Sequence, residues 1–421
     1  GMGTATLLRV FLPFAAGYFL SYLFRVVNAV LAPDLAADIG VGPSALGLLT
    51  SVYFITCASF QLPLGILLDR YGPRKTEAVL LMFAGLGAFI FSQAESLAGL
   101  VIGRAFIGFG VSACLMASFK AYTVWFDRSK WPVINGFQMA AGGLGALAAT
   151  SPVEWLVSIS DWRTVFVLLT GLSVLIGLLV LTVVPEKKRA PSSESLAAQL
   201  GGIKEVFTSL KFWHIAPLVT LSQAAFLSIQ GLWAGPWLRD VVGLERGEAA
   251  SVLFWVAVSM ICGFIGLGFI AARIARWGIT PAVTSAVCMA MFMTMQFLVL
   301  VTPPSWYFVV WLIFGFVGTS GIIAYAGLSQ LFEVRLSGRV TTGVNMLVFV
   351  AAFTAQWAIG IIIEMWPVGA DGSYHEQGFY YGFGLMLVLQ IGSLIWYVIG
   401  LWLLRKRDAI TRTRNVGLDD G

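Results

Sequence analysis

The loop that decides the fold reads Gly65-Ile66-Leu67-Leu68-Asp69-Arg70-Tyr71-Gly72-Pro73-Arg74-Lys75. It lies between two apolar runs, at approximately residues 45–68 and 78–94, and it combines an acid, several cations and two glycines. A simple anchor on the cytoplasmic side of a membrane explains the cations. It does not explain Asp69 or the glycines, so the pattern indicates a loop with a specific task between two membrane-spanning helices.

The composition around this loop is that of a polytopic membrane protein. Of the 421 residues, 58% are hydrophobic and 11% are charged, against about 45–50% and about 25% in soluble domains. A soluble globular enzyme is therefore not expected. Runs long enough to cross a bilayer lie at approximately 10–33, 45–68, 78–94, 96–119, 131–153, 164–185, 215–238, 249–272, 279–301, 305–332, 340–363 and 379–404.

The runs form two groups of six, because the polar and charged residues 186–213 interrupt the series. We expect an all-α membrane protein with twelve transmembrane helices in two pseudo-symmetric six-helix bundles. The N-terminal bundle covers residues 1–186, a cytoplasmic linker covers 187–212, and the C-terminal bundle with its basic tail covers 213–421. The second bundle repeats the loop in part, with Arg273 at the position of Arg70 and Ala272 at that of the acid.

The positions of the cations predict the orientation, since cytoplasmic loops carry an excess of Lys and Arg. With the N-terminus inside, 20 of the 26 fall in cytoplasmic segments. Both termini are then cytoplasmic, in a bacterial-type inner membrane. The net charge of +5 follows from this topology, so no nucleic-acid partner is needed beside the lipid bilayer.

The Gly65–Lys75 loop resembles the G-x-x-x-D-R-x-G-x-R-K signature of the major facilitator superfamily, at the place between helices 2 and 3 where that family carries it. The resemblance extends over nearly the whole chain and implies the two-bundle fold and secondary transport by rocker-switch alternating access. It also implies a cytoplasmic gate in which contacts break and re-form as the halves rock. The residues assigned to gating on this basis are Gly65, Asp69, Arg70, Gly72, Arg74 and, by internal repetition, Arg273.

Arg104 is the first residue of Arg104-Ala105-Phe106-Ile107-Gly108-Phe109-Gly110, which is similar to the R-x-x-x-G-x-G pattern of the family's helix 4. Its depth of ~10 Å below the outer face allows it to snorkel, to pair or to face a cavity. We group it with the gating residues, and its role stays open between structural and functional. The fifth run lacks the Gly-Pro of proton-driven drug exporters, which argues against a multidrug antiporter.

Arg25 is the strongest indication of a binding site. It lies about 15 residues into the first run, ~22 Å along the helix axis, too deep to reach the cytoplasm. A buried arginine at such depth is costly unless it is paired or lines a water-filled cavity. Tyr18, Tyr22 and Asn28 recur at helical spacing and are expected on the same face. No carboxylate is found inside any of the twelve runs, so the missing counter-charge is expected to be the substrate.

Other polar or aromatic residues of the runs are candidates for the cavity wall. Each of them could instead form a hydrogen bond between helices, and Lys120 could simply snorkel to the cytoplasmic surface. The candidates for substrate binding are Arg25, Tyr18, Tyr22, Asn28, Tyr53, Gln61, Lys120, Gln230, Trp233, Tyr325, Asn345 and Gln356.

An arginine on helix 1 also resembles the organic-phosphate and nitrate branches of the superfamily. Phosphate-ester antiporters add a second arginine on helix 7, where this chain has Gln230 and Trp233 instead. That difference argues against phosphate esters and favours a monoanion, such as a small organic carboxylate.

We therefore expect a secondary active transporter of a small, anionic solute, coupled either to protons or to a counter-anion. One chain holds both halves of the cavity, so a monomer suffices. The alternatives are a proton-driven drug or metabolite exporter, a membrane sensor or a membrane-embedded enzyme. No cofactor is expected, because no nucleotide-binding loop is found, and no metal is expected, because the chain has only two histidines, His214 and His375.

Overall fold

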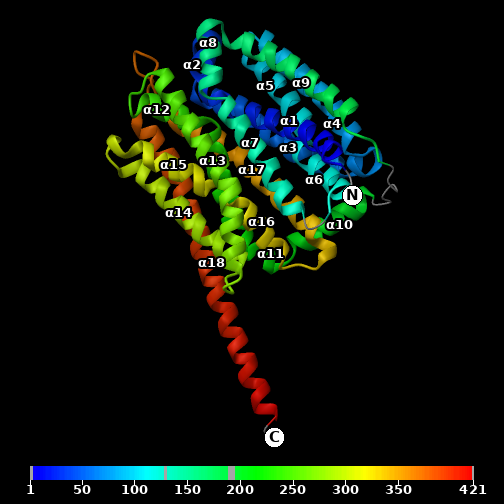
Figure 1. Ribbon diagram of the computed structural model, residues 1–421. Helices are drawn as coiled ribbons and strands as arrows, with labels where there is room; N and C mark the ends of the chain where they lie inside the picture. The colour runs from blue at the N-terminus through cyan, green and yellow to red at the C-terminus, as the bar shows by residue number, and fades with distance from the viewer. Residues whose placement is uncertain (1–2, 128–129, 188–194, 420–421) are drawn as a thin grey trace.

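The computed structural model (Figure 1) describes residues 3–127, 130–187 and 195–419. These residues form helices joined by short loops. Eleven helical segments of the described chain are long and apolar enough to cross a membrane. The expected fifth run, 131–153, forms two shorter helices in succession. The eleven long segments and the divided fifth run together are consistent with the twelve membrane crossings of the all-α protein that the sequence predicts.

The first six runs fold into nine helices, because three runs are broken inside the apolar stretch. The first run gives α1 and α2, the fourth gives α5 and α6, and the fifth gives α7 and α8. The bounds are α1 Thr4–Val26, α2 Asn28–Ile39, α3 Pro43–Tyr71, α4 Pro73–Gln93, α5 Leu97–Val111, α6 Cys114–Trp125, α7 Trp131–Ala148, α8 Ser151–Ile159 and α9 Trp162–Val183.

The second half begins with α10, Leu196–Phe207, which lies in the expected linker. Two of its runs are also interrupted, one by a π-helical turn and one by a 3-10 turn. The bounds are α11 Leu210–Ser228, η2 Ile229–Trp233, α12 Ala234–Asp240, α13 Arg246–Ala275, α14 Pro281–Val301, η3 Pro304–Trp306, α15 Tyr307–Val317, η4 Gly318–Ser320, α16 Gly321–Ser329, η5 Val334–Leu336, α17 Ser337–Glu364 and α18 Glu376–Asp419.

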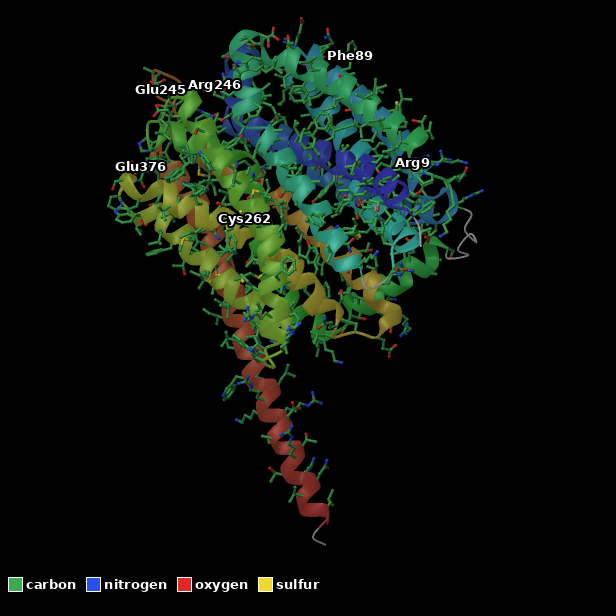
Figure 2. The ribbon with its side chains drawn as sticks, viewed as in Figure 1. Arg9, Phe89, Glu245, Arg246, Cys262 and Glu376 are labelled. Atoms are coloured by element: carbon green, nitrogen blue, oxygen red, sulfur yellow. The ribbon has the colours of Figure 1, made fainter. Side chains whose placement is uncertain are left out.

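The two halves of the chain lie side by side (Figure 1). They are joined mainly where α3 packs on α17 and α7 packs on α13. One end of the molecule carries Arg9, the Asp69 loop and α10, and we call it the basic end. Arg246 and Glu376 lie at the opposite end (Figure 2), and the last turns of α18 project beyond the other helices on the side away from them.

The break between α1 and α2 has an identifiable cause in Arg104. In a continuous helix the carbonyls of Phe24 and Arg25 would accept hydrogen bonds from the N–H groups four residues on. Here the Arg104 guanidinium donates to Phe24 O, and to Arg25 O at 3.2 Å. A side chain inserted into the ladder of backbone bonds bends a helix, so Arg104 sets the break at Val27, two residues beyond Arg25.

Pro33 frees another carbonyl, that of Ala29, on the other side of this break. Proline has no N–H, so Ala29 O lacks its usual partner four residues on. Arg239 of α12 donates to Ala29 O from Nη1 at 3.2 Å. Gly235 allows the close approach, because a Cβ there would lie 2.1 Å from Ala29 O. Pro33 thus leaves Ala29 O free to accept a hydrogen bond from Arg239, which joins the first half of the chain to the second.

The expectation that no carboxylate lies inside the runs is wrong for the third run. Its helix, α4, begins at Pro73 rather than near residue 78, and Glu77 lies in its second turn, completely buried. The hydropathy pattern excluded Glu77 because charged residues precede it. Gly17 on α1 provides the room, since a Cβ on Gly17 would lie 2.3 Å from Glu77 Oε1.

Candidate functional site

The interrupted helices meet around a central cavity of about 110 Å³. Its wall includes Arg25 before the α1–α2 break, Val111 and Ser112 at the α5–α6 break, and Thr319 in η4. Phe226 and Leu227 line it from the end of α11, directly before the π-helical turn. Discontinuous helices at the interface of two repeats are typical of the substrate sites of secondary transporters.

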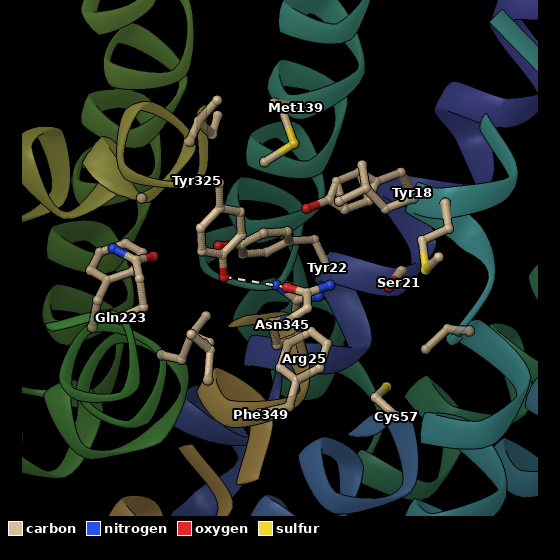
Figure 3. Close-up of a pocket in the computed structure, with 18 of the residues that line it drawn as sticks. Tyr18, Ser21, Tyr22, Arg25, Cys57, Met139, Gln223, Tyr325, Asn345 and Phe349 are labelled. Carbon is tan, nitrogen blue, oxygen red and sulfur yellow. Dashed lines mark hydrogen bonds between the residues drawn. The ribbon is translucent and has the colours of Figure 1, made fainter. Parts of the chain in front are cut away.

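Arg25 occupies the middle of this cavity among aromatic rings (Figure 3). Its Cζ lies 4.5 Å from the ring centroid of Tyr22, 5.7 Å from that of Tyr53 and 5.8 Å from that of Phe349. Its Nε is buried without a hydrogen-bond partner. Among the described residues no carboxylate forms a salt bridge with Arg25. The cavity therefore has a positive centre with aromatic faces and hydroxyl groups around it.

Helices of the first half hold the hydroxyl groups of this wall in place. Ser21 Oγ and Tyr53 Oη are 2.9 Å apart, and Tyr53 Oη also donates to Ser21 O at 3.1 Å. Tyr18 and Tyr22 pack edge to face, with ring centroids 5.9 Å apart. Gly142 of α7 makes room for both rings, because a Cβ there would lie 2.9 Å from Tyr18 and 3.0 Å from Tyr22.

The second half contributes amide and hydroxyl groups to the same cavity. Tyr325 Oη donates to Asn345 Oδ1 at 3.3 Å, and this pair lies beside Arg25 in Figure 3. Gln223 donates from Nε2 to Gly318 O at 3.3 Å. A site with one arginine, several neutral donors and aromatic walls can hold a small anion with an apolar or hydroxylated body.

The structure brings together part of the expected substrate-binding set. The predicted residues that line the central cavity are Arg25, Tyr18, Tyr22, Tyr53, Gln61, Tyr325 and Asn345. They come from α1, α3, α16 and α17, so both halves of the chain contribute.

The other predicted residues lie outside the cavity lining, in contacts between helices. Asn28 follows the α1–α2 break and donates from Nδ2 to Thr50 Oγ1 at 3.0 Å. Trp233 donates from Nε1 to Gln356 O at 2.9 Å, and Gln356 donates from Nε2 to Ser228 O at 3.4 Å. Gln230 is buried in the π-helical turn.

Several wall residues had no place in the expected set. Phe349 and Thr319 line the cavity, as does Cys57, whose thiol donates to Gly108 O at 3.2 Å. The sequence holds a signal for Thr319, the small polar stretch Gly318-Thr319-Ser320-Gly321 within an otherwise apolar run, and none for Phe349 or Cys57. Among the described residues, no group of three or more His, Cys, Asp or Glu side chains could hold a metal ion.

Residues 69–75, at the junction of α3 and α4, line a second cavity of about 380 Å³ at the basic end. Asp69 forms an ion pair there with Lys120 of α6. Arg74 donates from Nη1 to Leu181 O at 2.5 Å and lies 3.4 Å from Glu186, just beyond α9. Lys120 thus belongs to this loop's surroundings rather than to the central cavity, and the ion pairs tie the loop to the two neighbouring membrane runs.

The remaining residues of the expected gate lie around this loop. Gly72 takes a left-handed conformation, φ +83°, between α3 and α4. Gly65 lies against Gln199 of α10, since a Cβ there would be 3.2 Å from Gln199 Nε2. Arg70 and Arg273 are exposed. Arg104 is buried within the first half and donates to Thr50 O at 3.1 Å as well as to the α1 carbonyls, a position that favours the structural interpretation.

The linker helix α10 is fixed to the second half by an exposed ion pair. Arg335 of η5 donates from Nη2 to Glu205 Oε1 at 2.7 Å, and this hydrogen bond holds the pKa of Glu205 below its usual value. At the opposite end, Arg246 of α13 forms ion pairs with Asp34 of α2 and with Glu154 of α8, the latter at 2.6 Å. This cluster, which we call the Arg246 clamp, joins the two halves directly.

A twelve-helix membrane protein with a polar cavity at the interface of its halves has the architecture of a secondary transporter. Comparison with known families makes this specific, because residues 14–356 match the family model described as "Major Facilitator Superfamily". The chain belongs to the major facilitator superfamily, and it is an integral membrane protein of a family of transporters rather than enzymes.

Individual relatives within the superfamily are distant. The "Probable sulfoacetate transporter SauU" of Cupriavidus necator is 28% identical over 37% of this chain, and the alignment spans only 36% of SauU. The "Probable L-galactonate transporter" of Escherichia coli is 23% identical over 82% of this chain and 80% of its own. The "Multidrug resistance protein MdtL" of Klebsiella pneumoniae is 23% identical over 55% of this chain and 59% of its own.

A solved structure with the same fold covers almost all of the chain. It is that of a bacterial homologue of the human lysosomal transporter Spinster, in an inward-facing and unoccupied conformation. The TM-score is 0.72 at 16% identity, over 95% of this chain and 97% of that one. The likeness shows the fold of this protein.

Proposed function

We propose that this protein is a secondary active transporter of a small organic carboxylate-like anion, which Arg25 binds in the central cavity. The observation that carries the proposal is Arg25 itself, a cation among three aromatic rings with no carboxylate in a salt bridge to it in the described chain. A charge inside a membrane protein needs a partner or water. An anionic substrate would supply that partner in each transport cycle.

The names of the relatives agree with this substrate class. Sulfoacetate and L-galactonate, which name two of them, are both anions at neutral pH. L-galactonate combines one carboxylate with a hydroxylated body, which suits one arginine beside tyrosine and asparagine side chains, whereas sulfoacetate carries a carboxylate and a sulfonate and is a dianion. A single arginine matches a single acid group of the substrate, so monoanions are the favoured class.

Alternating access would proceed through the two ends of the molecule. The Arg246 clamp and the Arg239–Ala29 hydrogen bond join the halves at the opposite end, so we propose that this state is closed there. The loop around Asp69 is proposed as the gate at the basic end, with the Asp69–Lys120 ion pair breaking and re-forming as the halves rock. By the distribution of Lys and Arg, the basic end and both termini are proposed to be cytoplasmic, in an inner membrane.

A proton-driven exporter is the second candidate function, and two observations favour it. The chain has a relative named as a multidrug resistance protein, and α4 carries the buried acid Glu77 that such an exporter could use. The cavity itself argues for the anion, because its charged wall residue is Arg25 and Glu77 does not line it. A cationic drug would meet an unfavourable charge there.

Thermal unfolding of the purified protein against panels of organic anions, inorganic anions, cations and neutral drugs tests the proposal. A ligand that binds only the folded state stabilises it by about 2.7 kcal/mol at a hundredfold excess over its Kd. We expect one class of organic anions to raise the melting temperature of the wild type and of Arg276→Gln, an exposed control. Arg25→Gln should abolish the shift and Arg25→Lys should reduce it, because lysine lacks the planar fork of donors.

The exporter reading would replace the proposal if only cations or neutral drugs stabilised the protein, and did so equally in wild type and Arg25→Gln. The same panel therefore decides between the two candidates.

A further inference from the structure

Glu77 is a buried acid that does not line the proposed anion site. Its side chain is completely buried in α4, and apart from the weakly donating thiol of Cys114 neither carboxyl oxygen has a hydrogen-bond partner among the described residues. It points at Gly17 of α1, with the thiol of Cys114 beside it, because a Cβ on Gly17 would lie 2.3 Å from Glu77 Oε1 and 3.8 Å from Cys114 Sγ.

The surroundings of Glu77 favour the neutral carboxylic acid. An ionised carboxylate away from water needs hydrogen bonds or a paired cation, and without them the group takes up a proton. The described part of the chain has no salt bridge to Glu77. The titratable and charged groups on α4 and on the helices around it are Arg74 and Lys75 on α4, Arg9, Tyr18, Tyr22 and Arg25 on α1, Tyr53, Cys57, Asp69, Arg70 and Tyr71 on α3, Arg104 on α5, Cys114, Lys120 and Tyr122 on α6, and Arg163 on α9. Of the cations, Lys120 pairs with Asp69, and Arg104 donates to backbone carbonyls.

Glu77 lies between the two cavities of the molecule. Pro73, one turn earlier on α4, lines the cavity at the basic end, as do Phe14 of α1 and Ala121 of α6. Tyr18 and Leu115, which directly follow Gly17 and Cys114 in the chain, line the central cavity. A small relative movement of α1, α4 and α6 would therefore bring water to the carboxyl group from one cavity or the other.

We propose that Glu77 is a proton-binding site that couples anion transport to proton movement. In the state described here the carboxylic acid is closed off and holds its proton. When the helices around it move and water reaches the group, the O–H bond breaks, the proton passes to water, and the electron pair stays on the carboxylate. One proton on Glu77 and one monoanion at Arg25 would together make an electroneutral load. The inference rests on the proposed anion transport for its coupling, though not for the protonation itself.

Infrared spectroscopy of the purified full-length protein tests the protonation without any substrate. We expect a carbonyl-stretch band of a protonated acid at neutral pH, present in wild type, lost in Glu77→Gln and retained in Glu95→Gln. Glu95 is an exposed glutamate, which makes it a matched control. Glutamine has the shape of the neutral acid, so the variant should fold, and a melting curve checks this. Glu77→Asp, which keeps a titratable group, should keep a band. Equal spectra for wild type and Glu77→Gln would overturn the proposal.

Uptake into proteoliposomes tests the coupling, with sulfoacetate, L-galactonate and nitrate as the probes. With the lumen more alkaline than the medium, wild type and Glu95→Gln should accumulate at least one probe, and Glu77→Gln should lose that accumulation. The variant should still exchange internal for external probe, because exchange needs no net proton movement. Accumulation by Glu77→Gln equal to that by wild type would overturn the coupling. No uptake or exchange of any probe by wild type would instead overturn the anion assignment and the coupling with it, while the infrared band decides the proton site separately.

Discussion

Arg25 and Arg104 are two arginines within the same half of the molecule with different surroundings. Arg104 donates to three backbone carbonyls, those of Phe24, Arg25 and Thr50. Arg25 faces aromatic rings and an open cavity. A cation that donates from each of its three nitrogens to the backbone positions other groups, whereas a cation that lines a cavity and has aromatic and phenolic neighbours can bind a ligand. Depth in the membrane does not distinguish a positioning arginine from a ligand-binding one. The groups that each guanidinium contacts do distinguish them.

Removal of the Arg104 guanidinium should therefore affect folding more than gating. Arg104→Gln leaves the buried carbonyls of Phe24 and Arg25 without their donor, which should lower the free energy of unfolding by on the order of 3 kcal/mol. Denaturation in mixed micelles measures the loss, with Arg276→Gln as a control at an exposed arginine. A variant of unchanged stability whose rate of conformational exchange differed from wild type would favour the gating role instead.

On the first run, the predicted binding residues that line the cavity precede the helix break, and Asn28, which does not line it, follows the break. Helical spacing predicts a common face for Tyr18, Tyr22 and Arg25, and these residues line the cavity. Asn28 was expected on that face, but Arg104 interrupts α1 before it, and Asn28 turns to Thr50. The helical periodicity of the first run contains no information about Arg104, because this residue comes from another helix and acts on the α1 carbonyls through space.

At the scale of elements, interruptions of the membrane helices shape the site more than the helices themselves. The breaks in the first, fourth, seventh and tenth runs all adjoin the central cavity. Hydropathy predicts each run as one unbroken span, because the small or polar residues at the breaks are too few to interrupt the apolar pattern of a whole run. Pro236 is the one local signal at the π-helical turn, since it has no N–H to bond Leu232 O.

Close packing of α4 on α5 depends on glycines, and this gives a test of the helix contacts. A Cβ on Gly87 would lie 2.6 Å from both Gly103 O and Ile107 N. These are backbone atoms that cannot turn aside, so Gly87→Ala should destabilise the protein by roughly 1–3 kcal/mol through overpacking. Gly171→Ala on α9 is the matched control, because nothing lies within 4 Å of a Cβ there. Equal melting temperatures for the two variants would contradict the packing described here.

At the scale of the whole molecule, the Arg246 clamp holds the halves together at one end. Arg246 comes from the second half, and Asp34 and Glu154 come from the first. All three side chains are partly buried, with exposures of 27%, 21% and 17%, so the pairs are screened less than exposed ones. The clamp should therefore bias the equilibrium between the two access states towards closure of this end.

Neutralising the clamp should open the end that carries Arg246 more often. In Asp34→Asn with Glu154→Gln, the side chains keep their shape and lose their charge. Spin labels at Ala37 and Gly247, both exposed, should report a larger population of long distances across this end than in the parent. Glu245→Gln, an exposed acid beside Arg246, should leave the distances as they are. An unchanged distribution in the double variant would show that other contacts hold the halves together.

The sequence predicts the two groups of membrane helices and the place of the Gly65–Lys75 segment between two of them, because hydropathy and charge decide both. It does not predict the contacts between the halves. Arg246, Asp34 and Glu154 are far apart in the chain, and nothing in the local pattern around any of them indicates the others. The Arg246 clamp depends on how the bundles are docked, which only the folded structure contains.

The measurement that tests the central claim most directly is transport of an organic anion by Arg25 variants in proteoliposomes. Wild-type protein should exchange radiolabelled sulfoacetate or L-galactonate across the membrane, and unlabelled organic monoanions should compete. Arg25→Gln should lose the exchange while it keeps the wild-type melting temperature in the absence of ligand, and Arg25→Lys should retain a part of it. Equal exchange of the same anions by wild type and Arg25→Gln would contradict the claim that Arg25 binds the transported anion.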